Sequence, residues 1–256
     1  MTKIMIIDTE TTGLFHIKGS NNTKIDKAIS TKDFETTIGY FQDASWLNKC
    51  PYITQMSFIV YDTEKQCILQ NYNMFIDMDI KIKINKVASK ITHMYACLED
   101  AIENGENIFD ETLIVLSNIK KNYPEKIKTA EQMMSEFIYA LDICECIIAH
   151  NVSFDIKMLL VEAKRLNNMF YFKKIFEIKQ ECTMIQSIEI CSLMVYNKKG
   201  AYKKYPKLKE AYEKMFDDLP LNNALHNALY DAYICLKIYC KLKDLNQPLN
   251  ELIFSQ

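Results

Sequence analysis

Two acidic residues near the N-terminus are the first candidates for chemistry. Asp8 and Glu10 follow four consecutive apolar residues, Ile4 to Ile7, in the stretch KIMIIDTETTGL. An apolar run of this kind is typical of a central strand buried between two layers, and strand alternation places both acids on one face, about 6.6 Å apart. Two carboxylates at the end of a buried strand repel each other and lose hydration, which a divalent metal would relieve. A solvated strand end carrying two incidental acids gives the same local pattern.

A second strand–turn–helix unit carries another candidate acid. Residues 146–149 are apolar and predict a short buried strand, His150 and Asn151 form the turn, and a helix begins near Ser153. Asp155 lies in the first turn of that helix, where the helix dipole alone would favour a carboxylate. Because α/β sheets place their sites at the carboxyl ends of strands, Asp155 is also a candidate site residue.

The last predicted helix, from about residue 227 to 242, brings a fourth acid. Asp231 lies at the edge of the apolar stripe of this helix, where an acid without a cation would be costly. His226 lies just before the helix. A histidine there is often a structural hydrogen-bonding residue, but the neighbouring acids favour a part in the same site.

Composition sets the frame for these candidates. The chain has 256 residues, of which 49% are hydrophobic, enough for one large core or two small ones. No apolar run is long enough to span a bilayer, and the N-terminus lacks a signal-peptide pattern. The nine cysteines lack metal-site spacing and are best interpreted as reduced thiols of an intracellular protein, with zinc binding as a weaker alternative.

The remaining elements predict an early three-stranded unit. Residues 52–62 and 67–78 are two further strands joined by a hairpin turn, and residues 84–122 predict short helices with loops. The segment from 15 to about 50 is polar and is expected to be an irregular surface insertion, either flanking the site or serving as a spacer. Phe34, Tyr40, Phe41 and Trp46 are expected to order it in part. Residues 129–141 predict an amphipathic helix capped by Thr129.

Lysine provides almost all of the positive charge. Two clusters are Lys81, Lys83, Lys86 and Lys90, and Lys198, Lys199, Lys203, Lys204, Lys207 and Lys209, whereas Arg165 is the only arginine. Such clusters are either solvated faces or contacts to nucleic acid. Because lysine meets phosphate as a point charge and arginine reads base edges, any nucleic-acid contact is expected to follow the backbone without sequence specificity.

Three motifs together resemble a known family. IMIIDTETTG at 4–13, HNVSFD at 150–155 and HNALYD at 226–231 are similar, in order and spacing, to the three motifs of the DEDD 3′–5′ exonucleases, which include the proofreading subunit of bacterial replicative polymerase. His226, five residues before Asp231, makes the third motif resemble that of the DEDDh branch. TQMSF at 54–58, ECTM at 181–184 and YPKL at 205–208 also resemble family segments. Relatives often carry His-Gly-Ile-Thr where this chain reads SKITHM, and the 15–50 segment is longer than expected.

The resemblance implies a fold and a mechanism. The fold would be ribonuclease-H-like, α/β, with a mixed five-stranded sheet flanked by helices, forming one exonuclease domain over residues 1–256. Asp8, Glu10, Asp155 and Asp231 would hold two Mg²⁺ or Mn²⁺ ions, hard cations suited to oxygen ligands, for phosphodiester hydrolysis. His226 would accept a proton from the attacking water, and nucleoside 5′-monophosphates would leave the 3′ end.

The resemblance also assigns substrate contacts. Thr11 and Thr12 would meet the terminal nucleotide, Leu14 would wedge against its base, Asn151 and Phe154 would line the pocket, and Lys207 would bind phosphate further along the strand. The substrate class stays open between DNA and RNA, because nothing in the sequence reports on the 2′-hydroxyl. A catalytically idle binding module of the same fold is a further alternative. A proofreading role would require a separate polymerase partner, since no polymerase domain is recognisable.

Overall fold

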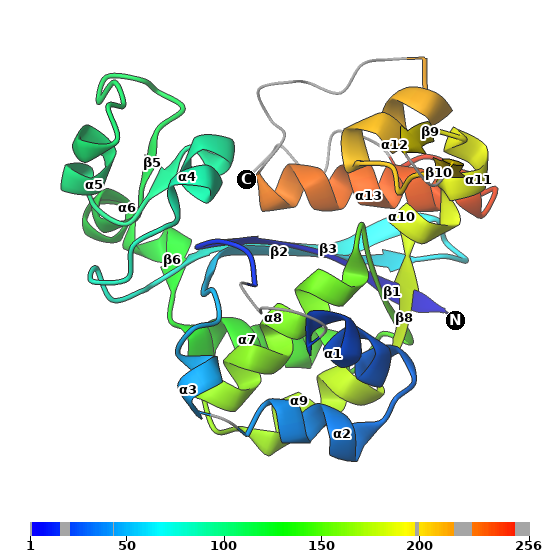
Figure 1. Cartoon of the computed structure of the whole chain (residues 1–256), viewed down its shortest axis with the longest axis horizontal. Coiled ribbons are helices and arrows are strands. Elements are labelled where there is room, and N and C mark those ends of the chain that lie inside the picture. The colour runs from blue at the N-terminus through cyan, green and yellow to red at the C-terminus, as the bar shows by residue number, and fades with distance from the viewer. Residues whose placement is uncertain (1, 16–20, 43, 198–199, 218–226, 249–256) are drawn as a thin grey trace.

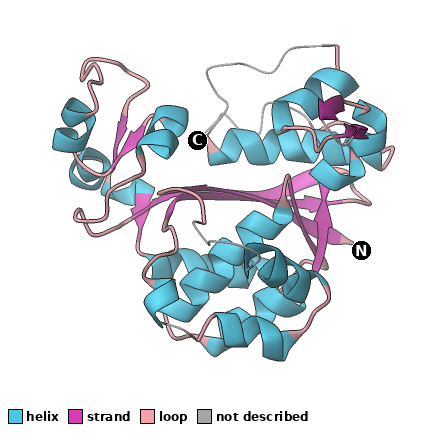
Figure 2. Cartoon of the chain, in the orientation of Figure 1, coloured by secondary structure: helices cyan, strands magenta, loops and turns pink. Residues whose placement is uncertain are grey.

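A central mixed sheet organises the computed structural model, which describes residues 2–15, 21–42, 44–197, 200–217 and 227–248. Its strands lie in the order β6-β3-β2-β1-β7-β8, with helices packed on both faces (Figures 1 and 2). The strands are β1 (Lys3–Thr11), β2 (Ile53–Asp62), β3 (Cys67–Ile76), β6 (Ile127–Lys128), β7 (Cys146–Ala149) and β8 (Lys179–Cys182). The expected α/β architecture is therefore confirmed, with one correction. Within the described residues the sheet has six strands and not five.

The strand directions follow the predicted order of units. β1, β2 and β3 form an antiparallel meander, and β7 and β8 add to it in parallel beside β1. The extra strand β6 pairs in parallel with the end of β3 over two residues, Phe75 with Ile127 and Ile76 with Lys128. Two residues are too few to show a strand period, so no local pattern predicts β6.

β1 separates two apolar layers, as its apolar run predicts. Met5 and Ile7 pack into the larger core, which the helices α7, α8 and α9 cover. Ile4 and Ile6 face the opposite layer, where α13 covers the sheet. All four of these side chains are at most 1% exposed. The strand that carries Asp8 and Glu10 is therefore held from both sides.

The 15–50 segment is more regular than the sequence suggested. It contains the helices α1 (Asn21–Ser30), α2 (Phe34–Tyr40) and α3 (Ala44–Leu47), so the expectation of irregular structure is wrong for the described part. Ile25, Ile29 and Phe41 are buried against the larger core, and Phe41 contacts the rings of Trp46 and Phe172. These few apolar residues are widely spaced among polar ones, so their helical period is weak in the sequence.

A small lobe lies beyond the β6 edge of the sheet (Figure 1). It comprises α4 (Lys86–Thr92), β4 (Met94–Tyr95), α5 (Leu98–Glu103), β5 (Ile114–Val115), α6 (Leu116–Asn122) and η1 (Pro124–Lys126). Ile84, Met94 and Leu116 form its core, against which Phe75 of β3 packs. The predicted short helices are present, and β4 pairs with β5 in a separate two-stranded sheet that was not predicted.

The helices that bear on the site agree closely with the sequence. α7 (Ala130–Leu141) begins at a capping box formed by Thr129 and Gln132, and α8 (Val152–Arg165) and α13 (Ala228–Leu242) lie where expected. The other elements are α9 (Met169–Glu177), α10 (Thr183–Gln186), α11 (Ile188–Cys191), β9 (Met194–Asn197), β10 (Gly200–Lys203) and α12 (Leu208–Met215). Among the described residues, none of the helices combines the length and apolar character needed to cross a membrane.

Candidate active site

Three carboxylates converge where β1 meets α13. Asp8 and Glu10 alternate on the face of β1 that α13 covers, and Asp231 lies in the first turn of that helix. Each residue offers a carboxylate oxygen, and these atoms all lie within 4.8 Å of one another. Asp231 is 8% exposed, whereas Asp8 and Glu10 are partly exposed. The strand end and the helix start thus form one acidic cluster.

Asp155 approaches this cluster from the opposite layer of the structure. β7 pairs with β1 only beside residues 4–6 and ends at Ala149, so the end of β1 has no parallel neighbour on that side. Asp155 lies in the first turn of α8 and is 3% exposed. The hydroxyl of Thr9 donates a 2.9 Å hydrogen bond to Asp155 Oδ1, which ties the carboxylate to the strand between Asp8 and Glu10.

Burial and mutual repulsion disfavour the ionised forms of these acids. Burial, followed by the charges of Asp231, Asp155 and Glu10, raises the pKa of Asp8 well above its usual value. Burial, with Asp231 and Asp155, raises the pKa of Glu10 to about 8. Burial also raises the pKa of Asp155 to about 7, although the hydrogen bond from Thr9 opposes this change. The cluster therefore carries an electrostatic cost that a cation would remove.

The residues fit a site for hard divalent cations. The donors are carboxylate oxygens, the ligands that Mg²⁺ and Mn²⁺ prefer. Asp8, Glu10 and Asp231 form the group within 4.8 Å, and Asp155 adjoins it through the Thr9 hydroxyl. Among the described residues, no cysteine or histidine joins the group whose ligand atoms lie within 4.8 Å. The nine cysteines are unbridged in the structure.

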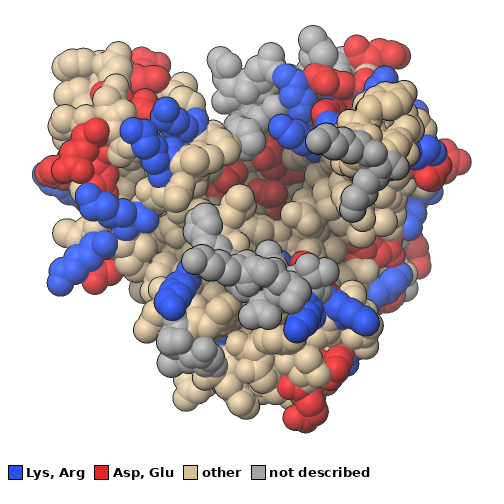
Figure 3. All heavy atoms as spheres, viewed as in Figure 1, with Lys and Arg blue, Asp and Glu red and all other residues tan. Residues whose placement is uncertain are grey.

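An apolar groove of about 320 Å³ adjoins the acidic cluster. Its lining comes from the end of β1 and the following loop, from α4 and from α8, and comprises Thr9, Glu10, Thr11, Gly13, Leu14, Asn85, Val87, Ala88, Ile91, Thr92 and Phe154. Figure 3 shows acidic side chains inside a hollow between the lobe that carries α4 and the part that carries α13. Glu10 is the carboxylate shared by the cluster and the groove.

The structure brings some of the predicted substrate contacts together. Thr11, Leu14 and Phe154 line the groove, and Leu14 is 67% exposed there. Thr12 is not part of its lining, because its backbone and hydroxyl bond to Tyr52 and its carbonyl accepts from Asn85. His226 lies outside the described residues.

Two other predicted contacts also lie away from the groove. Asn151 is an exposed residue with φ 79° at the start of α8, and Lys207 is exposed at the start of α12. His150, from the same motif as Asn151, is a structural link. Its Nε2 donates to the carbonyl of Pro206 at 3.0 Å, and its Nδ1 lies 3.1 Å from the hydroxyl of Thr183, which therefore donates to it. Burial lowers the pKa of His150 to about 4, so it is neutral near pH 7.

Sequence reasoning missed Thr9 and the wall formed by α4. Thr9 lies between two candidate ligands and was treated as part of the strand, although its alternation toward α8 was a usable signal. Asn85 caps α4 by accepting from the amide of Val87, and Val87 is 65% exposed in the groove. Ile91 and Thr92, the two residues of the SKITHM segment at 89–94 that match His-Gly-Ile-Thr, both line the groove.

No protein-family model and no curated protein matches the sequence, whereas solved structures match its fold. Escherichia coli exonuclease I bound to a 5cy-dA13 oligonucleotide aligns with 94% of this chain and 40% of its own, at 12% identity and a TM-score of 0.53. The chain has the ribonuclease-H-like fold of exonuclease I.

Other structures of that enzyme agree. The zinc-bound form of the E. coli enzyme with single-stranded DNA covers 95% of this chain and 40% of its own, at 11% identity and a TM-score of 0.55. A product-bound exonuclease I aligns with 95% of this chain and 44% of its own, at 11% identity and a TM-score of 0.55. The chain thus spans about two fifths of the length of the exonuclease I structures it matches.

The raised pKa values predict a specific pH dependence of stability. In EDTA, the free energy of unfolding should contain a contribution that falls as pH rises from about 5 to 8. The folded state raises the pKa of Glu10 to about 8 and of Asp155 to about 7, whereas unfolded carboxyl groups titrate near 4, so the folded state binds more protons in this interval. Urea denaturation at a series of pH values measures the effect.

The matched control is Glu10→Gln, which keeps the shape and cannot ionise. Relative to this variant, the wild type should lose roughly 1 kcal/mol of stability per pH unit while Glu10 ionises. The opposite contribution of His150 cancels in the comparison. If the free energy of unfolding changed with pH in the same way in both proteins, the raised pKa of Glu10 would be contradicted.

Proposed function

We propose that this protein is a metal-dependent 3′–5′ exonuclease that hydrolyses phosphodiester bonds of DNA and releases nucleoside 5′-monophosphates. The proposal is supported by the grouping of Asp8, Glu10 and Asp231 beside a groove, with Asp155 bonded to the neighbouring Thr9, on a fold shared with exonuclease I. A four-carboxylate cluster suits two Mg²⁺ or Mn²⁺ ions, which supply an activated water and stabilise the leaving oxyanion. We place the chain in the DEDDh branch on its three motifs, as one catalytic domain.

The groove gives the terminal nucleotide a place beside the carboxylates. Leu14, Ile91 and Phe154 offer apolar surface for a base or sugar, and Glu10 lies at the acidic end. An apolar wall packs against any base. Lysines such as Lys207, which lies away from the groove, would add point charges for phosphates further along the strand. The enzyme is therefore expected to remove nucleotides with little dependence on sequence.

His226 completes the proposed chemistry. It lies five residues before Asp231 in the HNALYD motif, and its usual pKa of about 6.5 suits a general base near neutral pH. Thr9 holds Asp155 in place, and the cover provided by α13 desolvates the acids so that a cation binds them more strongly. A proofreading role would add a separate polymerase partner to this scheme.

DNA is favoured over RNA by one observation. The solved structures that share the fold include exonuclease I bound to dA13, dA16 and dT13 oligonucleotides. RNA is the second candidate substrate. End-labelled DNA and RNA, single- and double-stranded, with Mg²⁺ or Mn²⁺, provide the direct test. Turnover of RNA alone would reassign the substrate, and turnover of none of them would leave a binding module of the same fold.

The carboxylates should be individually essential. Asp8→Asn, Glu10→Gln, Asp155→Asn and Asp231→Asn should each lower kcat by at least about 10³-fold while the protein stays folded, because each removes a charge that holds the ions. EDTA should abolish activity, and Mg²⁺ should restore it. Asp142→Asn, an exposed acid paired with Lys174, is the matched control and should be fully active. Any active variant of the four would remove that residue from the site, and activity in EDTA would refute metal dependence.

The enzyme should act from the 3′ end. A blocked 3′ hydroxyl should stop degradation and a blocked 5′ end should not, with mononucleotides present from the first time point. Thin-layer or mass-spectrometric product analysis follows the reaction, and binding should weaken strongly with salt because lysines provide the contacts. Cleavage of a circular single strand would instead show an endonuclease.

Substitution of His226 should lower catalysis without weakening metal binding, unlike substitution of the acids. His226→Ala should lower kcat by about 10²–10⁴-fold and abolish the acidic limb of the pH–rate profile, while metal and substrate still bind. Equilibrium titration with Mn²⁺ and with a 3′-blocked oligonucleotide measures the binding. A His226→Gln variant with nearly full activity and an unaltered acidic limb would make this residue a hydrogen-bonding group rather than the base.

A further inference from the structure

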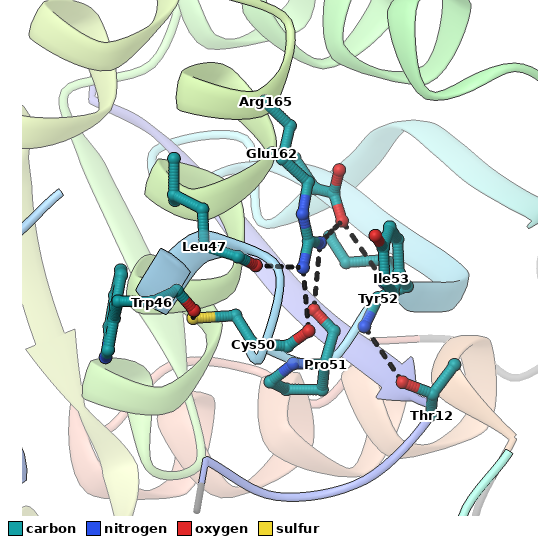
Figure 4. Close-up of polar contacts among 9 residues, drawn as sticks. All are labelled: Thr12, Trp46, Leu47, Cys50, Pro51, Tyr52, Ile53, Glu162 and Arg165. Carbon is teal, nitrogen blue, oxygen red and sulfur yellow. Dashed lines mark hydrogen bonds and ion pairs between the residues drawn. The ribbon is translucent and has the colours of Figure 1, made fainter. Parts of the chain in front are cut away.

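The single arginine of the chain is used inside the protein. Arg165 lies in the last turn of α8, the helix that carries Asp155 in its first turn. Its guanidinium reaches across to the segment between α3 and β2, where it meets three backbone carbonyls (Figure 4). Nη1 donates to the carbonyl of Pro51 at 2.9 Å, and Nη2 donates to the carbonyls of Leu47 at 3.0 Å and Cys50 at 2.7 Å.

Two side chains fix the guanidinium in this position. Nη1 also donates to Glu162 Oε1 at 2.7 Å, and the same oxygen accepts from the amide of Ile53 at 3.4 Å. Glu162 is 4% exposed, so its charge depends on Arg165. The guanidinium carbon lies 3.6 Å from the centre of the Tyr52 ring, in stacking contact. Lysine has neither the plane for this stack nor donors directed at four acceptors.

The segment held by Arg165 is bonded directly to the end of β1. The amide of Thr12 donates to the carbonyl of Tyr52 at 2.9 Å, and the amide of Tyr52 donates to the Thr12 hydroxyl at 2.9 Å. The strand register shifts between Glu10 and Thr11, so the regular ladder does not hold this end by itself. The carbonyl of Thr12 accepts from the amide of Asn85 at 2.7 Å, the residue that caps α4.

These contacts form one continuous connection. It runs from α8 through Arg165 to Tyr52, then through Thr12 to Asn85 and α4. At one end, α8 carries Asp155. Thr12, in the middle of the connection, lies two residues after Glu10. At the other end, α4 forms a wall of the groove. A change in where the 51–53 segment sits would therefore move Glu10 and the groove loop relative to Asp155.

We propose that Arg165 is a positioning residue for the candidate site: it sets the position of Glu10 and of the loop after it relative to Asp155. The partners of the guanidinium described above are not part of the groove lining, so it would act through Tyr52 and Thr12. The catalytic part of this inference rests on the proposed exonuclease function, whereas the positional part concerns the connection itself.

The test compares Arg165→Lys with Lys32→Met. Lys32 also donates to two backbone carbonyls, those of Phe176 and Ile178, but these lie at the end of α9. Arg165→Lys should lower kcat by about 10- to 100-fold and weaken Mn²⁺ binding without nucleic acid by about tenfold, as lost outer-sphere support typically does. Amide hydrogen exchange at Thr12, Tyr52 and Asn85 should accelerate. Lys32→Met should lose stability and change none of these quantities.

Tyr52 provides a second pair of variants should Arg165→Lys fail to fold. Tyr52→Phe keeps the ring beneath the guanidinium and should behave as wild type. Tyr52→Leu removes the ring and, like Arg165→Lys, should weaken Mn²⁺ binding and accelerate hydrogen exchange of the Thr12 amide. Unchanged Mn²⁺ affinity and unchanged exchange in both Arg165→Lys and Tyr52→Leu would overturn the proposal. If the wild type cuts no nucleic acid, the proposed function fails, and metal titration and exchange still decide the role of Arg165.

Discussion

The repulsion among closely placed carboxylates, of which Asp155 and Asp231 are buried, is the constraint on which this structure depends. Three of them offer oxygens within 4.8 Å of one another, and Asp155 is tied to the strand between two of them. Side chains that repel do not stay together unless rigid elements hold them. The chain meets this requirement by taking its acids from a strand buried on both faces and from the first turns of two helices. The sheet layers are thus the means by which like charges are kept close.

The same constraint explains why the surroundings of the acids are so fully bonded. Thr9 binds Asp155, Thr12 binds Tyr52 and Asn85, and Arg165 binds three carbonyls of one turn. Each of these residues has polar groups that would be costly to bury alone. The mutual repulsion of the carboxylates is not relieved by these bonds, and a cation would relieve it. The fold itself therefore favours cation binding, because it holds the carboxylates close together.

Sequence reasoning predicted the elements with strong periodic signals. The apolar run at 4–7, the short strand at 146–149 and the stripe of the last helix are each long or pure enough to be interpreted locally. β6 and the helices of the 15–50 segment depend on a few contacts with distant residues, such as Phe41 with Phe172, which no local pattern reveals. The candidate acids were found by their type, spacing and order in three motifs, because each acid alone also fits a solvated strand end or an ordinary helix start. Thr9, Asn85 and Val87 are ordinary residues whose place at the site comes only from tertiary structure.

The hydrogen bond between Thr9 and Asp155 joins residues 146 positions apart in the chain. Asp231 comes from the last described helix and Asp8 from the first strand, on the opposite side of the sheet from α8. No contiguous fragment that lacks either helix layer contains all four acids. A nascent or partly unfolded chain therefore does not hold the four acids together. Under the proposed exonuclease function, the topology would confine the reactive state to molecules in which both helix layers are in place.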